Sequence, residues 1–255
     1  MKKYKDKNWL FNKYWNKELN IPQIAEICEV SNLTIRYWMI KFNISIRSVG
    51  EANSLKQVKN HCKLSRKAIE WISGELLGDG SLNCRSLHSA RFRYSSKHFE
   101  YIQYIANILK SFGIEGGEIK ERYHKERNYY SYSHASYAYA ELFPIYKHWY
   151  PNGKKIVPKD IKLTSLTCRQ WVIGDGCLRH DKRGGRPYIV LFTCGFLISD
   201  VKRLIKKLIN LGFKITRLPS INSIRISAHS TKDFLNFIGK CPVQCYQYKF
   251  ATKGE

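Results

Sequence analysis

A six-residue motif with a central aspartate occurs twice in the chain. It reads Leu77-Gly78-Asp79-Gly80-Ser81-Leu82 and returns, 175 − 79 = 96 residues later, as Ile173-Gly174-Asp175-Gly176-Cys177-Leu178. Each copy closes an apolar stretch with helical spacing, residues 69–78 and 163–174, so each aspartate is expected at the C-terminal end of a helix, before a glycine cap. A carboxylate is unfavourable there because the helix dipole already places about half a negative charge at that end. Two such acids indicate a site that uses negative charge.

Small residues on both stretches would let the two helix ends meet. Gly74 and Gly78 on the first helix and Gly174 on the second allow close packing, which brings Asp79, Asp175 and the terminal carbonyls to one point. Like charges at that distance need a cation, and hard oxygen ligands select Mg²⁺, with Mn²⁺ as a substitute. The expected metal ligands are therefore Asp79, Asp175 and the carbonyl groups of Gly78 and Gly174.

The charge of the chain indicates a polyanionic partner. Of its 255 residues, 44 are Lys or Arg and 20 are Asp or Glu, a formal net charge of +24 spread from end to end. Nucleic acid is the expected partner. The 44% hydrophobic content excludes a disordered chain, and no apolar run approaches the ~18 residues of a membrane span, so no membrane partner is expected. On a basic protein, a paired-carboxylate metal site predicts phosphodiester hydrolysis.

Both motifs are followed by segments of alternating polarity and then by a longer helical pattern, over residues 99–113 and 199–213. In residues 90–95 the period of two puts Arg91 and Arg93 on one face of a strand and Phe92 and Tyr94 on the other. Residues 118–122 and 222–227 alternate likewise. This pattern predicts a duplicated α/β unit whose sheets have one apolar and one basic face. The expected DNA contacts on these sheets are Arg91, Arg93, Lys120, Arg122, Arg217 and Arg225, and the alternative is a basic face that is merely solvated.

Residues 1–47 have the pattern of a small helical domain. Two short helices, one opening at Ile21-Pro22 and one capped by Ser31 or Asn32, are separated by the spacing of a helix-turn-helix. Glu29 stands in the turn where Gly is usual. We expect Asn32, Thr34 and Arg36 to contact DNA, whereas the alternative is a helical hairpin that only covers the larger domain. Residues 48–64 are interpreted as a linker.

The nonapeptides at residues 72–80 and 168–176 resemble the two helix motifs of the LAGLIDADG homing endonucleases. Leu163-Thr164 and Trp171 also resemble the context of the second motif in single-chain members, and the resemblance covers about residues 65–250. It implies an α+β fold, with a duplicated αββαββα pseudo-twofold core and two basic antiparallel sheets, whose halves would be residues 65–160 and 161–255. It also implies a monomeric, metal-dependent enzyme of intron homing that makes a double-strand break in a long DNA target.

The same resemblance nominates two lysines. Residues 153–158 are similar to the lysine-bearing segment of the family, which assigns Lys155, with Lys154 as the alternative, and Tyr248-Lys249-Phe250 assigns Lys249. In the family such lysines lie beside the scissile phosphates and stabilise developing charge. The implied catalytic set is Asp79, Asp175, Lys155 and Lys249. One departure is Gln170, which stands where the first motif has Gly74 and predicts a less symmetric interface.

Two other functions use the same scaffold: a DNA-binding regulator without nuclease activity, and an RNA-splicing maturase. The presence of both Asp79 and Asp175 argues against the regulator, since a core without catalysis need not keep two destabilising acids. No small-molecule substrate is expected.

The N-terminal lysines are not followed by an apolar stretch, so no secretory signal peptide is expected and the protein is placed in the cytoplasm, associated with the nucleoid. The eight cysteines lack the paired spacing of a zinc module and are expected to be reduced thiols.

Overall fold

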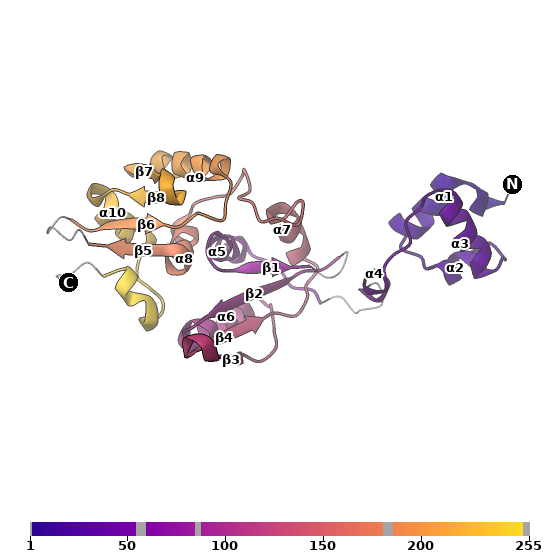
Figure 1. Ribbon diagram of the computed structural model, residues 1–255, viewed down its shortest axis with the longest axis horizontal. Helices are drawn as coiled ribbons and strands as arrows, with labels where there is room; N and C mark the ends of the chain where they lie inside the picture. The colour runs from indigo at the N-terminus through magenta and orange to yellow at the C-terminus, as the bar shows by residue number, and fades with distance from the viewer. Residues whose placement is uncertain (1, 55–59, 85–87, 181–185, 252–255) are drawn as a thin grey trace. The chain divides into compact units, whose positions relative to one another are not determined.

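The computed structural model describes residues 2–54, 60–84, 88–180 and 186–251. These residues form two compact units (Figure 1): unit 1 comprises residues 2–54, and unit 2 comprises the other described residues. Of the expected linker, residues 49–54 form a short helix of unit 1, residues 55–59 lie outside the described residues, and residues 60–64 belong to unit 2. In the described part of the chain, no helix is long and apolar enough to cross a membrane.

Unit 1 is entirely helical. Its elements are η1 (Lys3–Lys5), α1 (Lys7–Phe11), the π-helical turn η2 (Asn12–Asn16), α2 (Ile21–Ile27), α3 (Asn32–Lys41) and α4 (Val49–Ser54). Ile24 and Ala25 of α2 pack with Ile35 and Met39 of α3, and all four side chains are buried. Ile35 and Met39 lie one helical turn apart on one face of α3, and this shared apolar core is why two such short helices hold together.

Local side-chain bonds set the ends of α2 and α3. Asn20 and Gln23 form a reciprocal capping box at the start of α2. The Ser31 hydroxyl accepts a hydrogen bond from the backbone N–H of Thr34, so Ser31 rather than Asn32 caps α3. Glu29, between the two helices, has φ +53, in the left-handed region that favours glycine. The turn therefore has the backbone conformation of the usual glycine with a different side chain on it.

Unit 2 contains the predicted duplication. The first half consists of α5 (Arg66–Leu77), β1 (Ser81–Asn83), β2 (Arg91–Ser96), α6 (Phe99–Ser111), β3 (Lys120–His124), β4 (Tyr129–Ala135) and α7 (Leu142–Trp149). The second half consists of α8 (Ser165–Asp175), β5 (Gly176–Arg179), β6 (Tyr188–Leu191), α9 (Ile198–Asn210), β7 (Ile215–Leu218), β8 (Ser223–Ile226) and α10 (Ala228–Ile238). The 3-10 helix η5 (Gln244–Lys249) follows, and shorter 3-10 turns, η3 (Lys125–Arg127) and η4 (Pro219–Ile221), join the hairpin strands. Each half thus has the expected order αββαββα.

Each half folds its strands into one four-stranded antiparallel sheet with the same topology, β1-β2-β4-β3 and β5-β6-β8-β7. The alternation predicted for β2 is confirmed, because Phe92 and Tyr94 are buried and Arg93 is exposed. The alternation predicted for residues 118–122 is wrong. The strand there is Lys120–His124, and its side chains from Lys120 to Tyr123 are exposed on both faces because β3 lies at the edge of the sheet.

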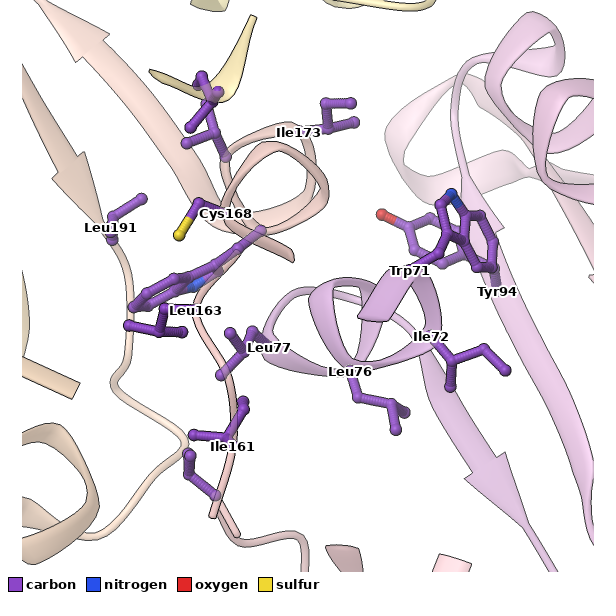
Figure 2. Close-up of a cluster of buried hydrophobic side chains, with 14 of the residues drawn as sticks. Trp71, Ile72, Leu76, Leu77, Tyr94, Ile161, Leu163, Cys168, Ile173 and Leu191 are labelled. Carbon is purple, nitrogen blue, oxygen red and sulfur yellow. The ribbon is translucent and has the colours of Figure 1, made fainter. Parts of the chain in front are cut away.

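Helices α5 and α8 lie side by side at the centre of unit 2, between the two sheets (Figure 1). A Cβ atom built on Gly74 would lie 2.5 Å from the Thr167 carbonyl oxygen and 2.8 Å from the Gln170 Cβ, so only glycine fits there. The apolar side chains of both helices enter one core. Figure 2 shows Leu77 near Leu163, and Trp71 beside Tyr94.

All eight cysteines are free thiols, as expected. Cys168 is fully buried in the core of unit 2, where Figure 2 shows it facing Leu191, and this burial raises the pKa of its thiol to about 12. It therefore behaves as a small apolar side chain.

Candidate active site and nucleic-acid interface

The ends of α5 and α8 meet at two glycines. A Cβ atom on Gly78 would lie 3.0 Å from the Cα of Gly174, and the converse distance is also 3.0 Å. Helix α5 ends with Gly78 at its C-cap, before Asp79, whereas α8 includes Asp175 and has Gly176 at its C-cap. The expected glycine cap after the acid is therefore correct only for the second motif.

These glycines are required by space and not by a left-handed backbone. Neither Gly78 nor Gly176 has a positive φ, and Gly176 is in the extended region, with φ −90 and ψ 148. A Cβ on Gly80 would lie 2.7 Å from the Glu75 carbonyl oxygen, and one on Gly176 would lie 2.5 Å from that of Val172. The chain thus turns back tightly against the last helical turn after each motif, which holds Asp79 and Asp175 at the helix ends.

The two acids are close enough to affect each other. Burial, and after it the negative charge of Asp79, raise the pKa of Asp175 to about 6, although Lys155 and Lys249 oppose both effects. Asp79 itself is exposed. The structure therefore brings together the two predicted acids, and part of the pair is open to a ligand.

Both predicted lysines reach the same place from outside the two helices. The Lys155 Nζ donates to the carbonyl oxygens of Gly78 at 3.1 Å and Gly80 at 2.8 Å. The Lys249 Nζ donates to those of Ile173 at 2.6 Å and Gly174 at 3.0 Å. Each ammonium group therefore lies at a helix C-terminus, where the helix dipole favours a cation.

Burial also shifts the pKa of both lysines. It lowers the pKa of Lys155 to about 8, while the nearby carboxylates of Asp175, Asp79 and Glu75 act in the opposite direction. The pKa of Lys249 is lowered by the same cause. Lys154, the alternative to Lys155, is exposed. Of the two neighbours, Lys155 is the one hydrogen-bonded at the helix end.

A third carboxyl group, Glu75, lies one helical turn before Asp79 and was not identified from the sequence. It is fully buried, and its Oε1 accepts hydrogen bonds from the Tyr101 hydroxyl at 2.7 Å and from the Gln170 Nε2 at 2.8 Å. Burial raises its pKa to about 8. Gln170 of α8 stands at the motif position that Gly74 occupies in α5. The predicted asymmetry of the helix interface is confirmed, because Gln170 donates a hydrogen bond across it to Glu75. The available signal was an acid on the buried face of an apolar helix.

The donor set at the helix ends fits a hard divalent cation. Within the described residues, no three His, Cys, Asp or Glu side chains form a cluster that could hold a metal. Mg²⁺ does not need one, because it is commonly held by one or two carboxylates together with water and substrate phosphate. The carbonyl oxygens of Gly78 and Gly174 already accept from the two lysines, and each has a second lone pair.

The sheet of the first half presents a basic face. Arg93 pairs with Ala135 in register, Lys120 with Ser133 and Arg122 with Ser131. Paired residues of an antiparallel sheet lie on the same face, so Arg91, Arg93, Lys120 and Arg122 share the face opposite the buried Phe92 and Tyr94. Four of the six residues predicted to contact DNA from the sheets therefore lie on one surface.

The other two residues, Arg217 of β7 and Arg225 of β8, lie on opposite faces of the second sheet. Arg225 lies on the face opposite Ile224 and Ile226, with its guanidinium 4.1 Å from the ring centroid of Tyr188. Arg217 pairs in register with Ile224, so it lies on the apolar face, and its Nη2 donates to the Asn222 Oδ1 at 3.1 Å. The structure does not bring Arg217 to the surface that includes Arg225.

The predicted contacts of unit 1 lie on α3. Asn32 and Arg36 are exposed, and Thr34 is half-buried with its hydroxyl 3.0 Å from that of Ser31. Sequence reasoning did not single out Leu33 and Ile40, whose side chains are 77% and 62% exposed on the same helix. The exposed surface of α3 thus combines polar, basic and apolar groups.

Comparison with known proteins identifies the family. The model of the LAGLIDADG DNA endonuclease family matches residues 69–234, which is more than half of the chain. The match includes both motifs and both sheets, and the chain belongs to this family.

Two curated proteins are similar in sequence. The uncharacterized protein MJ1098 of Methanocaldococcus jannaschii is 27% identical over 172 residues, which are 64% of this chain and 65% of that protein. The cytochrome b mRNA maturase bI2 of Debaryomyces hansenii is 28% identical over 156 residues, which are 57% of this chain and 56% of that protein. The matched region therefore spans less than two thirds of either relative.

Among solved structures, the homing endonuclease I-WcaI bound to its DNA recognition sequence is similar with a TM-score of 0.64. The sequence identity is 20%, and the match covers 78% of this chain and 90% of that chain. The similarity shows that unit 2 has the LAGLIDADG fold.

Proposed function

We propose that the protein is a site-specific DNA endonuclease that makes a double-strand break by metal-dependent phosphodiester hydrolysis. One observation carries this proposal: two carboxylates and two lysines come together at the ends of α5 and α8, beside a sheet with a basic face. The charge of +24 supports a polyanionic substrate.

Each residue of the site has a proposed role. Asp79 and Asp175 would hold Mg²⁺, or Mn²⁺ in its place, with the carbonyl oxygens of Gly78 and Gly174 nearby. The bound ion would supply an activated water and stabilise the leaving oxygen. Lys155 and Lys249 would stabilise negative charge on the phosphate in the transition state. With a pKa of about 8, Lys155 remains mostly protonated at pH 7.

The DNA would lie along the basic faces of the two sheets. Arg91, Arg93, Lys120 and Arg122 would contact it from the first half, and Arg225 from the second. Residues 1–47 would form a separate DNA-binding domain, in which Asn32 and Arg36 of α3 contact the major groove. The protein would act as a monomer, because one chain already contains both halves of the site.

The experiment that tests this proposal is a selection of cleaved sites from a randomised duplex library in Mg²⁺. We expect one long target site, cut on both strands in Mg²⁺ or Mn²⁺ and uncut in chelator. Specific binding without cleavage in either metal would contradict the proposal and support a regulator.

A second candidate function is that of an RNA-splicing maturase, which the similarity to maturase bI2 favours. A maturase would bind folded RNA with an affinity that survives excess duplex DNA. Competition between a structured intron RNA and duplex DNA for the full chain separates the two functions.

A further inference from the structure

The backbone of the Lys155 segment is held by α9 of the other half. Val157 lies two residues after Lys155, and its N–H donates to the Asp200 Oδ2 at 3.0 Å. The Arg203 Nη2 donates to the Val157 carbonyl oxygen at 2.7 Å and to the Asp200 Oδ1 at 2.7 Å. Asp200 is only 3% exposed. The side chains of Asp200 and Arg203, in the second half, therefore bond both the N–H and the carbonyl group of Val157 in the first half.

The Lys249 segment is held in the opposite direction. The carboxylate of Glu100, in the first turn of α6, accepts from the N–H groups of Gln244 at 2.7 Å and Cys245 at 3.0 Å. These residues begin η5, and Lys249 is its last residue. The hydrogen bond from the Gln244 N–H is the largest cause of the lowered pKa of Glu100. The first half thus caps the short helix that presents the lysine of the second half.

We propose that Asp200 and Glu100 are positioning residues, each of which fixes the catalytic lysine of the opposite half. This inference rests on the proposed endonuclease function. A lysine side chain has four rotatable bonds, so the position of its ammonium group depends on how firmly its backbone is held. In each case the holding carboxylate accepts two hydrogen bonds, which fix both its place and its orientation.

The hydrogen bonds of Asp200 and Glu100 cross from one half to the other, as does the contact that positions the two acids. The carboxylates of Asp79 and Asp175 are positioned by the contact between α5 and α8, which is a contact between halves. Because the hydrogen bonds of Asp200 and Glu100 also join the two halves, the positions of the lysines and of the acids depend on the same interface. A misplacement of about 1 Å in such a constellation can reduce rates by on the order of 100-fold.

The two lysines should act on different strands of the DNA. The helix ends are related by the internal duplication, and the strands of a duplex are related by the same kind of twofold symmetry. The cleavage rates of each DNA strand by Lys155→Met and Lys249→Met therefore show which strand each lysine acts on. Glu100→Ala should then slow the strand that Lys249→Met slows, by on the order of 10-fold to 100-fold, and leave the other strand within about twofold.

The experiment measures single-strand cleavage rates on the selected site, with each strand labelled at its own end. Asp200→Asn should slow the strand that Lys155→Met slows. Glu118→Ala and Asp233→Asn are matched controls, because they remove one exposed acid from each half without touching either lysine segment. DNA affinity should stay within about twofold, and nicked plasmid should accumulate. Because Glu100 is exposed, its replacement leaves the core intact even if Asp200→Asn lowers stability.

Amide hydrogen exchange of the full chain gives a readout independent of cleavage. Glu100→Ala should speed exchange in residues 244–249 and leave residues 154–157 unchanged, and Asp200→Asn should do the reverse. Equal slowing of both strands, or unchanged exchange in both segments, would overturn the inference. A wild type that cuts neither strand would instead refute the proposed function, and the exchange data would still decide whether these acids hold the segments.

Discussion

Replacing Glu75 with glutamine should change how the stability of unit 2 depends on pH. The carboxyl group is fully buried, its Oε1 accepts from Tyr101 and Gln170, and its Oε2 has no hydrogen-bond partner among the described residues. Burial raises the pKa of Glu75 from 4.5 to about 8. The folded protein therefore keeps the proton at neutral pH, whereas the unfolded chain releases it. Glutamine has nearly the same shape as the protonated side chain and cannot ionise.

The sign of the effect follows from proton linkage. A group whose pKa is raised on folding contributes its full stability below its unfolded pKa, near 4.5, and loses it as the pH rises through the folded pKa of about 8. Over that window the native state holds about one proton more than the unfolded state, so the free energy of unfolding falls by about 1.4 kcal/mol per pH unit. Between pH 5.5 and pH 7.5 wild type should lose about 3 kcal/mol relative to Glu75→Gln.

The assay is urea denaturation of both proteins at intervals over that pH range, without metal or DNA. Only the difference between the proteins matters, because the contribution of unit 1 is the same in both. Glu118→Gln is the control, since it removes an exposed carboxylate of the same half. Parallel pH profiles for wild type and Glu75→Gln would show that Glu75 is ionised in the folded protein, and the reasoning from its burial would be refuted.

Three further substitutions test other parts of the structure. Glu29→Gly should raise the free energy of unfolding of unit 1, measured by thermal melting, by on the order of 1 kcal/mol, because glycine adopts φ +53 without strain, and Glu29→Ala, which keeps the strain, should not. Gly74→Ala should destabilise unit 2 by about 2 kcal/mol in urea denaturation, because the added Cβ would lie 2.5 Å from a backbone oxygen of α8, and no loss would mean that the helices can separate freely. Asp175→Asn should stabilise the metal-free protein by on the order of 1 kcal/mol at pH 7, since the carboxyl pKa is raised to about 6, and should lose most of the stabilisation by Mg²⁺, so a less stable variant in chelator would contradict a strained acid pair.

Features with a local cause were predictable from the sequence. The helix ends at the repeated motif and the alternation in β2 depend on neighbouring residues only, and both were confirmed. The pairing of the two acids also followed, because the small residues that allow it lie on the same helices as the acids.

Features that depend on distant segments were not predictable in the same way. Arg217 lies in β7, and its pairing with Ile224 of β8 places it on the apolar face. Glu75 is explained by partners 26 and 95 residues away. The hydrogen bonds of Asp200 and Glu100 likewise join segments 43 and 144 or 145 residues apart.

The most direct test of the proposed function is cleavage of the selected duplex by wild type, Asp79→Asn and Asp175→Asn, with Asp233→Asn as the control. The proposal predicts that wild type and the control cut both strands in Mg²⁺ and neither strand in chelator. Both site variants should bind the duplex with nearly unchanged affinity and cut neither strand at a measurable rate. Full cleavage by either site variant, or cleavage by wild type in chelator, would contradict the assignment of the paired acids as a metal-dependent nuclease site.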